Sequence, residues 1–333
     1  MKLSILDQSI VNDSIPQSQA IVESIETAKH CEQLGYYRYW VSEHHNSPSV
    51  AGTAPEILVS AIAASTQKIR VGSAGVLLHF YSPYKVAEQF SVIESFAPDR
   101  IDLGVGRAPG ADGLSARALN ENFDPSSDYK MKIRELQHWL DGIPLPGDHI
   151  HGHGMITANP LGYSSPEIWL LGSSAESASI AAELGLPYSF AHFFNDGKGM
   201  PEALDIYRNE YIPSERFPRP VLNICISCIA ADSHERAMWL NSTRNHWRIQ
   251  FENGMRTALK CPAELKDWNY SQEEKGKIDR WNSTAIIGTV DQIENRIRNL
   301  SSEYDIDEFV LNTWTYDLED RLESYSLMSK LIS

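Results

Sequence analysis

The 333-residue chain contains only four cysteines, and no uninterrupted apolar run approaches the roughly 18 residues of a membrane-spanning helix. Four cysteines in a chain of this length do not form a disulfide framework. The N-terminal segment MKLSILDQSIVNDS has one lysine and an apolar run too short for a secretory signal. We therefore expect a cytoplasmic protein with no membrane association.

Basic residues are also few: 29 lysines and arginines face 44 aspartates and glutamates, which gives a formal net charge of −15. This charge repels a phosphate backbone, and no stripe of lysine and arginine overrides it locally. We therefore expect no nucleic-acid partner. Apolar residues at 42% and charged residues at 22% are typical of a folded protein with a large core.

No segment rich in proline, serine or glycine divides the chain, and a strand-like segment followed by a helix-like segment recurs eight times. The strand-like segments are residues 2–9, 37–45, 69–78, 100–108, 167–174, 188–194, 221–231 and 307–315. The helix-like segments are residues 17–34, 55–66, 84–96, 129–140, 175–184, 200–211, 235–247 and 318–331. Most of the strand-like segments are apolar on both faces, as parallel strands covered by helices are. The sequence therefore predicts an α/β architecture, a single (β/α)8 TIM barrel domain over residues 1–333.

Two long segments interrupt this repeat, residues 142–165 and residues 248–284. We interpret the second, which is polar, as an insertion after the seventh strand that serves as a lid or a packing arm. The first contains HIHGHG at 149–154, whose histidines could line one face of a strand as a metal-binding tract. Apart from Asp148 no carboxylate accompanies them, which favours a solvent-exposed hairpin.

In a barrel of this kind, active-site groups lie at the C-terminal ends of the strands. Glu43, His44 and His45 end the second strand, where a catalytic base, a metal ligand and a polar loop end are all open interpretations. A metal site needs at least three converging ligands, and His79 and His192 could join His44. However, the first strand, SILDQS, lacks the H-x-H of hydrolytic metal barrels. We therefore predict no metal site.

The fourth strand ends in GVGRAPG at residues 104–110. The glycines are spaced G-x-G-x-x-x-G, and Pro109 stands where the opening turn of a helix should carry amides, so the dinucleotide-binding pattern is absent. Gly104 and Gly106 leave room for a planar ligand to approach the backbone. Arg107 could grip a phosphate with its bidentate fork, or it could form a structural ion pair with an acid across the barrel mouth. This segment alone favours neither interpretation.

The fifth strand ends in LLGSSAES, which places Gly172, Ser173 and Ser174 at the start of a helix. Free backbone N–H groups, hydroxyls and the positive end of the helix dipole make such a segment an anion site. The other interpretation is N-capping by Ser173 or Ser174 with Glu176 in the first turn, which needs no ligand. Together with Arg107 on the neighbouring strand, these residues predict a pocket for one phosphate.

Cys225 and Cys228 in NICISCIAAD form a C-x-x-C pattern, but the flanking isoleucines indicate a strand. Side chains three positions apart in a strand face opposite sides of the sheet. We therefore expect two buried structural thiols rather than a metal or redox pair.

Several segments together resemble the bacterial-luciferase-like flavin monooxygenases. These segments are SEHHN, VGSAGVLLHFYSPYKVAEQ, DRIDLGVGRAPGAD, IWLLGSSAESASIAAELGLP and IIGTVDQIENRI, with DEFVLNT after it. They occur in family order and span most of the chain, and the resemblance is to the standalone branch rather than to the light-emitting heterodimer. It implies a (β/α)8 barrel that binds reduced flavin, usually FMN, over its mouth, and it suggests a homodimer.

The resemblance also implies roles for residues of a phosphate site and a catalytic group. His44 resembles the active-site histidine of the family. Arg107, Ser173 and Ser174, with Gly172 beside them, resemble its phosphate-binding positions, which agrees with the anion pocket inferred from the residues.

A second set of residues would face the flavin ring. Ser73 and Ala74 lie where the family often has a non-proline cis peptide that lets the ring pack on backbone. His192 falls where another member has a large aromatic residue beside the ring. Gly106 occupies the position of a reactive cysteine in the light-emitting enzymes, a departure that argues against light emission.

The activity implied is that of a two-component monooxygenase. A separate flavin reductase would supply reduced FMN, and molecular oxygen would oxidise a small organic substrate such as an aldehyde. His44 would act as general base or acid. Three alternatives stay open: a deazaflavin (F420)-dependent hydride-transfer oxidoreductase of the same superfamily, a flavin-binding protein without turnover, and a metal-dependent barrel hydrolase.

Overall fold

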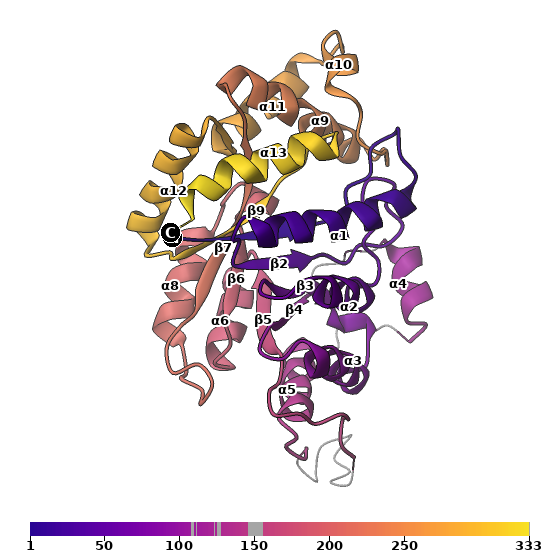
Figure 1. The fold of residues 1–333 in the computed structure, drawn as a ribbon, viewed down its shortest axis with the longest axis vertical. Coiled ribbons are helices and arrows are strands. Elements are labelled where there is room, and N and C mark those ends of the chain that lie inside the picture. The colour runs from indigo at the N-terminus through magenta and orange to yellow at the C-terminus, as the bar shows by residue number, and fades with distance from the viewer. Residues whose placement is uncertain (108–109, 111, 123, 125–127, 146–155, 333) are drawn as a thin grey trace.

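A closed barrel of eight parallel strands forms the centre of the computed structural model, which describes residues 1–107, 110, 112–122, 124, 128–145 and 156–332. The barrel strands are β1 (Lys2–Asp7), β2 (Arg38–Val41), β3 (Arg70–Leu77), β4 (Ile101–Gly106), β5 (Glu167–Gly172), β6 (Tyr188–Ala191), β7 (Leu222–Ala230) and β9 (Glu308–Asn312). Each strand pairs with its neighbours in chain order, and the barrel closes where β1 pairs with β9 (Figure 1). The predicted (β/α)8 fold is confirmed.

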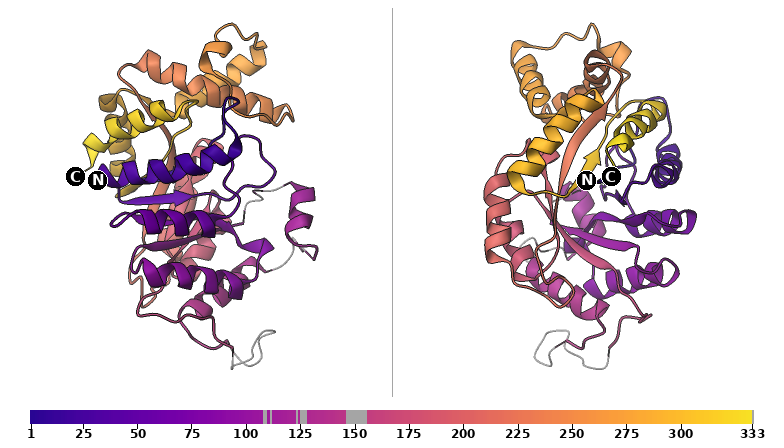
Figure 2. Two further views of the ribbon diagram at one scale, coloured as in Figure 1. Left: turned by 45° about the vertical axis from the view of Figure 1, so that its right-hand side comes forward. Right: turned by 60° about the vertical axis from the view of Figure 1, so that its left-hand side comes forward.

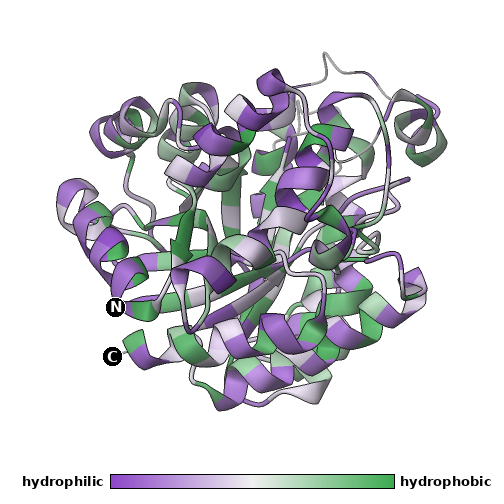
Figure 3. Cartoon of the chain, turned by 90° about the horizontal axis from the view of Figure 1, so that it is seen from above, coloured by the Kyte–Doolittle hydropathy of each residue, from purple (hydrophilic) through white to green (hydrophobic). Residues whose placement is uncertain are grey.

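Helices surround the barrel and connect its strands. They are α1 (Gln17–Gln33), α2 (Pro55–Ser65), α3 (Pro83–Phe96), α5 (Tyr129–Leu140), α6 (Ala175–Glu183), α8 (Met200–Glu210), α12 (Val290–Tyr304) and α13 (Leu318–Met328). Gly35 and Gly185, which follow α1 and α6, have φ angles of 84° and 61°, so both helices end at a left-handed residue as the sequence predicts. Seen from above, hydrophobic and hydrophilic residues alternate along the helices, as expected when one face of each is buried (Figure 3).

Shorter elements join these parts. They are η1 (Leu78–Phe80), α4 (Gly113–Leu119), α7 (His192–Asn195) and η2 (Ser329–Leu331). In the part of the chain that the structure describes, no helix is both long and apolar enough to cross a membrane. The tract at residues 149–154, for which we expected an exposed hairpin, lies outside the described residues.

The insertion after the seventh strand is larger than the sequence predicts. It comprises α9 (His234–Glu252), α10 (Pro262–Leu265), α11 (Gln272–Thr284) and the short strand β8 (Ile286–Gly288), which pairs with the end of β7 beyond the barrel. The predicted insertion at 248–284 therefore begins inside a helix, because α9 continues five residues past the predicted end at Trp247. Helix α12, which the sequence analysis did not identify as a barrel element, packs against β7 and β8.

The middle of the barrel interior is apolar. Its cluster contains Leu6, Trp40, Trp169, Cys225 and Val310, and the two tryptophan rings meet edge to face with centroids 5.2 Å apart. Cys228, three residues after Cys225, belongs instead to the cluster between strands and helices. Burial raises the pKa of both thiols. The two cysteines thus face opposite sides of β7 as buried thiols, which confirms the prediction.

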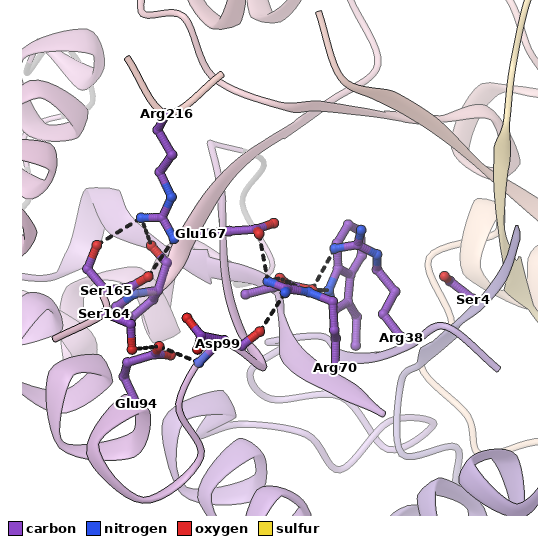
Figure 4. A network of polar contacts seen from close by, with 12 residues as sticks. Ser4, Arg38, Arg70, Glu94, Asp99, Ser164, Ser165, Glu167 and Arg216 are labelled. Atoms are coloured by element: carbon purple, nitrogen blue, oxygen red, sulfur yellow. Dashed lines mark hydrogen bonds and ion pairs between the residues drawn. The ribbon is translucent and has the colours of Figure 1, made fainter. Parts of the chain in front are cut away.

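The N-terminal end of the barrel is filled by buried charges (Figure 4). Arg38 donates to Asp102 Oδ2 and to Glu308 Oε1, both at 2.7 Å, and Arg70 donates to Asp102 Oδ1 at 2.5 Å. Asp102 has no exposed surface. It also accepts from the Trp40 indole at 2.8 Å, which joins this polar layer to the apolar layer above it. Because the layer lies opposite the C-terminal mouth, its role is in stability.

Candidate active site

All of the predicted site residues except His192 lie on four consecutive strands, at or toward their C-terminal ends. His44 follows β2, Ala74 lies near the end of β3, Arg107 follows β4, and Ser173 and Ser174 follow β5. Because β2, β3, β4 and β5 pair in that order, these ends are adjacent around the barrel mouth. The fold therefore brings the predicted residues to one side of the mouth.

His44 is a partly buried, neutral imidazole. Side chains two apart in an extended segment share a face, so Ser42 and His44 continue the face on which Trp40 enters the barrel. The Ser42 hydroxyl lies 3.1 Å from Nδ1 of His44, and the His44 amide donates to the Gly52 carbonyl at 2.8 Å. Burial lowers the pKa of His44 to about 4, against a smaller raising effect of Glu43. His44 is therefore uncharged near pH 7, and within the described residues its Nε2 has no hydrogen-bond partner.

Glu43 contacts His45 rather than His44. Its buried carboxylate lies 2.8 Å from His45 Nε2, accepts from the Tyr81 hydroxyl at 2.6 Å, and accepts from the Leu77 amide at 2.8 Å. These bonds join the segment after β2 to the end of β3. Glu43 and His45 thus hold the loop that carries His44, and neither makes a hydrogen bond with the His44 side chain.

The segment near the end of β3 presents backbone at the mouth. Its non-proline cis peptide joins Ala74 and Gly75, whereas the sequence analysis placed it between Ser73 and Ala74. Ser73 is fully buried, and its hydroxyl donates to the Gly104 carbonyl at 2.9 Å. A Cβ at position 75 would lie 2.7 Å from the same carbonyl oxygen, so glycine is required there. The partly exposed residues of this segment are Ala74 and Gly75.

Arg107 forms an ion pair with Glu176 in the first turn of α6. Both side chains are well exposed, Arg107 at 49% and Glu176 at 66%, so the pair contributes little to stability. One of the two interpretations of Arg107, an ion pair at the mouth, is thus present in the structure. The guanidinium also lies beside the N-terminus of α6, where an anion would compete with Glu176 for it.

Ser174 caps helix α6, as the second interpretation of this segment predicted. Its hydroxyl accepts from the Ser177 amide, and the Ser177 hydroxyl accepts from the Ser174 amide, both at 3.3 Å. A Cβ at Gly172 would lie 2.0 Å from the Ser177 hydroxyl, so only glycine lets the strand end approach this cap. Ser173 is partly buried and Ser174 is exposed. The helix N-terminus therefore opens toward solvent with its dipole available to an anion.

His192 lies at the start of α7, directly after β6, and is partly buried. Burial lowers its pKa, with Asp196 acting in the opposite direction. Its ring is held against the α7 to α8 turn, because a Cβ at Gly197 would lie 2.5 Å from His192 Nε2. His192 thus stands across the mouth from His44, on the side of β6 and β7.

The histidines do not converge on a metal. His79 stacks on Tyr129 with ring centroids 5.0 Å apart, on the side of helix α5. Within the described ranges, no group of three or more histidine, cysteine, aspartate or glutamate side chains could hold a metal ion. The mouth thus carries a neutral imidazole, the partly exposed Ala74 and Gly75, and Arg107 beside the N-terminus of α6.

Two arginines of the insertion reach the mouth, and the sequence analysis assigned neither. Arg256 donates to Asp112 Oδ2 at 2.7 Å and to the Asn46 carbonyl at 3.1 Å, which ties the segment after α9 to the loop after β2. Arg244 of α9 is buried beside β7. Neither belongs to a recognisable motif. The only available signal was their place in the segment that follows the seventh strand.

Comparison with known proteins identifies the family of the chain. The family described as luciferase-like monooxygenase matches residues 1–304. YwcH of Bacillus subtilis, an uncharacterized protein, is 39% identical over 332 residues, which are 99% of this chain and 98% of the relative. The N-acetyl-S-alkylcysteine monooxygenase of the same organism is 33% identical over 335 residues, with 100% of this chain and 98% of the relative covered.

Solved structures agree. The crystal structure of apo-MsnO8 matches with a TM-score of 0.89 and 32% identity over 99% of this chain and 96% of that one. The oxygenating constituent of 3,6-diketocamphane monooxygenase from Pseudomonas putida, a type II Baeyer–Villiger monooxygenase in complex with FMN, shares the fold with a TM-score of 0.72. Its identity is 16%, over 99% of this chain and 97% of that one. The chain described here therefore belongs to the luciferase-like monooxygenase family.

Proposed function

We propose that this family member is a monooxygenase that uses reduced FMN and molecular oxygen to oxidise a small organic substrate. The observation that carries the proposal is the meeting of three features on neighbouring strands: the neutral His44, the partly exposed Ala74 and Gly75, and Arg107 beside the N-terminus of α6. Bound reduced flavin would supply the electrons that activate oxygen.

The residues fit the phosphate of FMN. Arg107 can exchange its exposed partner Glu176 for a phosphate, which it would bind with two parallel hydrogen bonds. Ser173 and Ser174 add backbone N–H groups and hydroxyls at the N-terminus of α6, with Gly172 allowing the close approach of strand and cap. These four residues are the proposed phosphate site.

The end of β4 leaves space for the flavin ring. A Cβ at Gly106 would meet no atom within 4 Å. On the adjacent strand, Ala74 is partly exposed, while Ser73 holds this segment through its hydrogen bond to the Gly104 carbonyl. We propose that the ring lies on this surface with His192 toward its other side.

His44 would act as the proton acceptor and donor. Because burial lowers its pKa to about 4, the imidazole is neutral near pH 7 and can accept a proton at Nε2, as a weaker base than an exposed histidine. Ser42 orients the ring through Nδ1. The insertion that carries Arg256 reaches over the loop after β2 and would restrict water at the mouth.

The proposed partners are those that the family resemblance implies. A separate flavin reductase would deliver reduced FMN, and the working protein would be a homodimer. A relative acts, by its name, on N-acetyl-S-alkylcysteine, so the substrate panel should contain an alkyl thioether of that kind beside a long-chain aldehyde.

The test begins with anaerobic titration of the protein with reduced FMN and with reduced F420, followed by oxygen uptake and product analysis with the substrate panel. We expect binding of reduced FMN and oxidation of a substrate. Affinity for F420 alone would overturn the choice of cofactor, and FMN binding with no oxidation of any substrate would favour a non-catalytic flavin-binding protein.

The His44→Ala variant tests the catalytic assignment. We expect FMN affinity within a few-fold of the wild type and a loss of substrate oxidation by about two to four orders of magnitude, the usual worth of general acid–base catalysis. His234→Ala, at an exposed histidine on α9, is the matched control and should retain full activity. Unchanged oxidation in His44→Ala would remove its catalytic role.

A further inference from the structure

A polar cavity lies on the β6 and β7 side of the barrel mouth. It is lined by Ser227, Arg244 and His192, by Phe193 and the acid Asp196, and by Thr284 and Ala285 near the end of the insertion. The space in it that a water-sized group can occupy is about 10 Å³, and its empty volume of about 220 Å³ includes open solvent. The cavity therefore has room for a small polar group of a molecule but not for a flavin ring system.

Arg244 brings an unpaired cation to this cavity. Its side chain is buried, with 6% exposed, and among the described residues its guanidinium has one hydrogen bond, to the Phe193 carbonyl at 3.4 Å. The nearest carboxylate, Asp196, is occupied by Arg248, which donates to both of its oxygens at 3.1 Å. A buried cation without a carboxylate partner is costly, so a site of this kind calls for an anion from outside the chain.

The charge balance around the cavity is positive. Arg248 lies close to Arg244, and Arg296 lies close to His192. Asp196 is the acid that interacts with both Arg244 and His192. Arg296 donates to the Ala285 carbonyl at 2.6 Å, a neutral partner. Burial and the neighbouring Arg248 lower the pKa of Arg244 to about 10, which still leaves it protonated at pH 7. This local excess of positive charge contrasts with the net charge of −15.

Ser227 provides an independent second donor. Alternation along β7 places Ser227 on the same face as Cys225, which belongs to the apolar cluster inside the barrel. Ser227 is buried, with 6% of its surface exposed, and its hydroxyl has no hydrogen-bond partner among the described residues. Buried hydroxyls are normally satisfied. An unpartnered hydroxyl and a guanidinium with a single long hydrogen bond thus face one cavity.

We propose that Arg244 and Ser227 bind a carboxylate group of the substrate, so that the molecule oxidised by this protein is a small organic anion. This inference rests on the proposed function, in which the phosphate of FMN occupies another part of the mouth, at Arg107 and the start of α6. The guanidinium fork matches the two oxygens of a carboxylate, and the hydroxyl adds a third donor. Phe193 and Cys225, both in the apolar interior cluster, would contact the apolar part of the substrate.

The test measures binding without flavin or turnover. Hexanoate and hexanamide are the probes, because they share a chain and differ in charge, and isothermal titration calorimetry gives the dissociation constant of each. We expect hexanoate to bind wild-type protein at least about tenfold more tightly than hexanamide, the factor that one charge-assisted hydrogen bond supplies. Arg244→Gln should remove this preference, and Ser227→Ala, which breaks no existing bond, should reduce it several-fold.

Arg219→Gln is the matched control, since Arg219 is exposed just before the opposite end of β7 and its loss changes the net charge equally. The control should keep the full preference for hexanoate. A preference that persists in both Arg244→Gln and Ser227→Ala, or equal binding of the two probes by the wild type, would overturn the proposal. Loss of FMN binding in Arg244→Gln with hexanoate binding intact would also overturn it, and failure of the wild type to bind FMN would count against the proposed function alone.

Discussion

The contact between Gly172 and the cap of α6 gives a quantitative prediction. In Gly172→Ala the new Cβ would lie 2.0 Å from the Ser177 hydroxyl and 2.3 Å from Ser177 Cβ, so the end of β5 and the first turn of α6 must separate. The Ser177 hydroxyl also donates to the Ser174 carbonyl at 2.8 Å, and therefore cannot rotate away without loss. Overpacking costs about 1–3 kcal/mol and a lost cap about 1 kcal/mol. We expect the free energy of unfolding to fall by about 2–4 kcal/mol.

Gly106→Ala is the matched control, because Gly106 ends the neighbouring strand β4 and a Cβ there would meet no atom within 4 Å. Both substitutions restrict the unfolded chain equally, so the difference between them isolates the contact with Ser177. Urea unfolding of the protein without flavin, followed by the fluorescence of its eight tryptophans, measures both free energies.

A double-mutant cycle sharpens this test. Ser177→Gly removes the atoms that the new methyl group would meet, so Gly172→Ala should cost at least about 1 kcal/mol less in the Ser177→Gly background. If Gly172→Ala lies within about 0.5 kcal/mol of Gly106→Ala, or if the cycle shows no coupling, the packing argument is wrong. Gly172→Ala should also weaken the binding of FMN about tenfold if the proposed phosphate site is correct, because the N-terminus of α6 moves.

Three further predictions concern charge. Asp102→Asn leaves the buried Arg38 and the partly buried Arg70 short of one carboxylate and should lower the free energy of unfolding by about 3 kcal/mol. The surface change Glu294→Gln should alter it by less than about 0.5 kcal/mol in the same urea titration. The folded-state pKa of His44, about 4, lies below its ordinary value of 6.5, so its contribution to stability is present above pH 6.5 and is lost as pH falls toward 4. His44→Gln should therefore reduce the loss of unfolding free energy between about pH 7 and pH 5 by about 2 kcal/mol, and an unchanged pH profile would contradict the burial argument. Glu176→Gln frees Arg107 and should strengthen FMN binding several-fold in a fluorescence titration, whereas weaker binding would mean that Glu176 supports the site.

The barrel was predictable because its physical signal is local and repeated. Strands apolar on both faces, each followed by a helix, specify a parallel sheet covered by helices, and Gly35 and Gly185 mark the ends of two of these helices. The insertion was predictable only as a polar interruption. Strand β8 is three residues long and pairs with β7 beyond the barrel, so no period could identify it, and α12 was missed with it.

The site was predictable in position but not in contacts. The motifs placed His44, Arg107 and Ser174 at strand ends, and the fold brings them to adjacent places on the mouth. Glu43 meets His45 because side chains two positions apart in an extended segment share a face, whereas the motif by itself assigned no partner to Glu43. Arg244 could not be found either, since a buried cation on a largely polar helix gives no periodic signal.

The pairing of β1 with β9 has a consequence for synthesis of the protein. Arg38 and Ser4 find their common partner, Glu308, only after more than nine-tenths of the chain has been made. Until then two edge strands remain open, and a buried arginine lacks one of its two carboxylates. The chain ends also finish side by side (Figure 2). A ribosome-bound chain that stops before residue 308 should thus stay sensitive to proteases and depend on chaperones. If the two ends are joined by a short linker and new ends are made in another loop, the barrel should keep its fold.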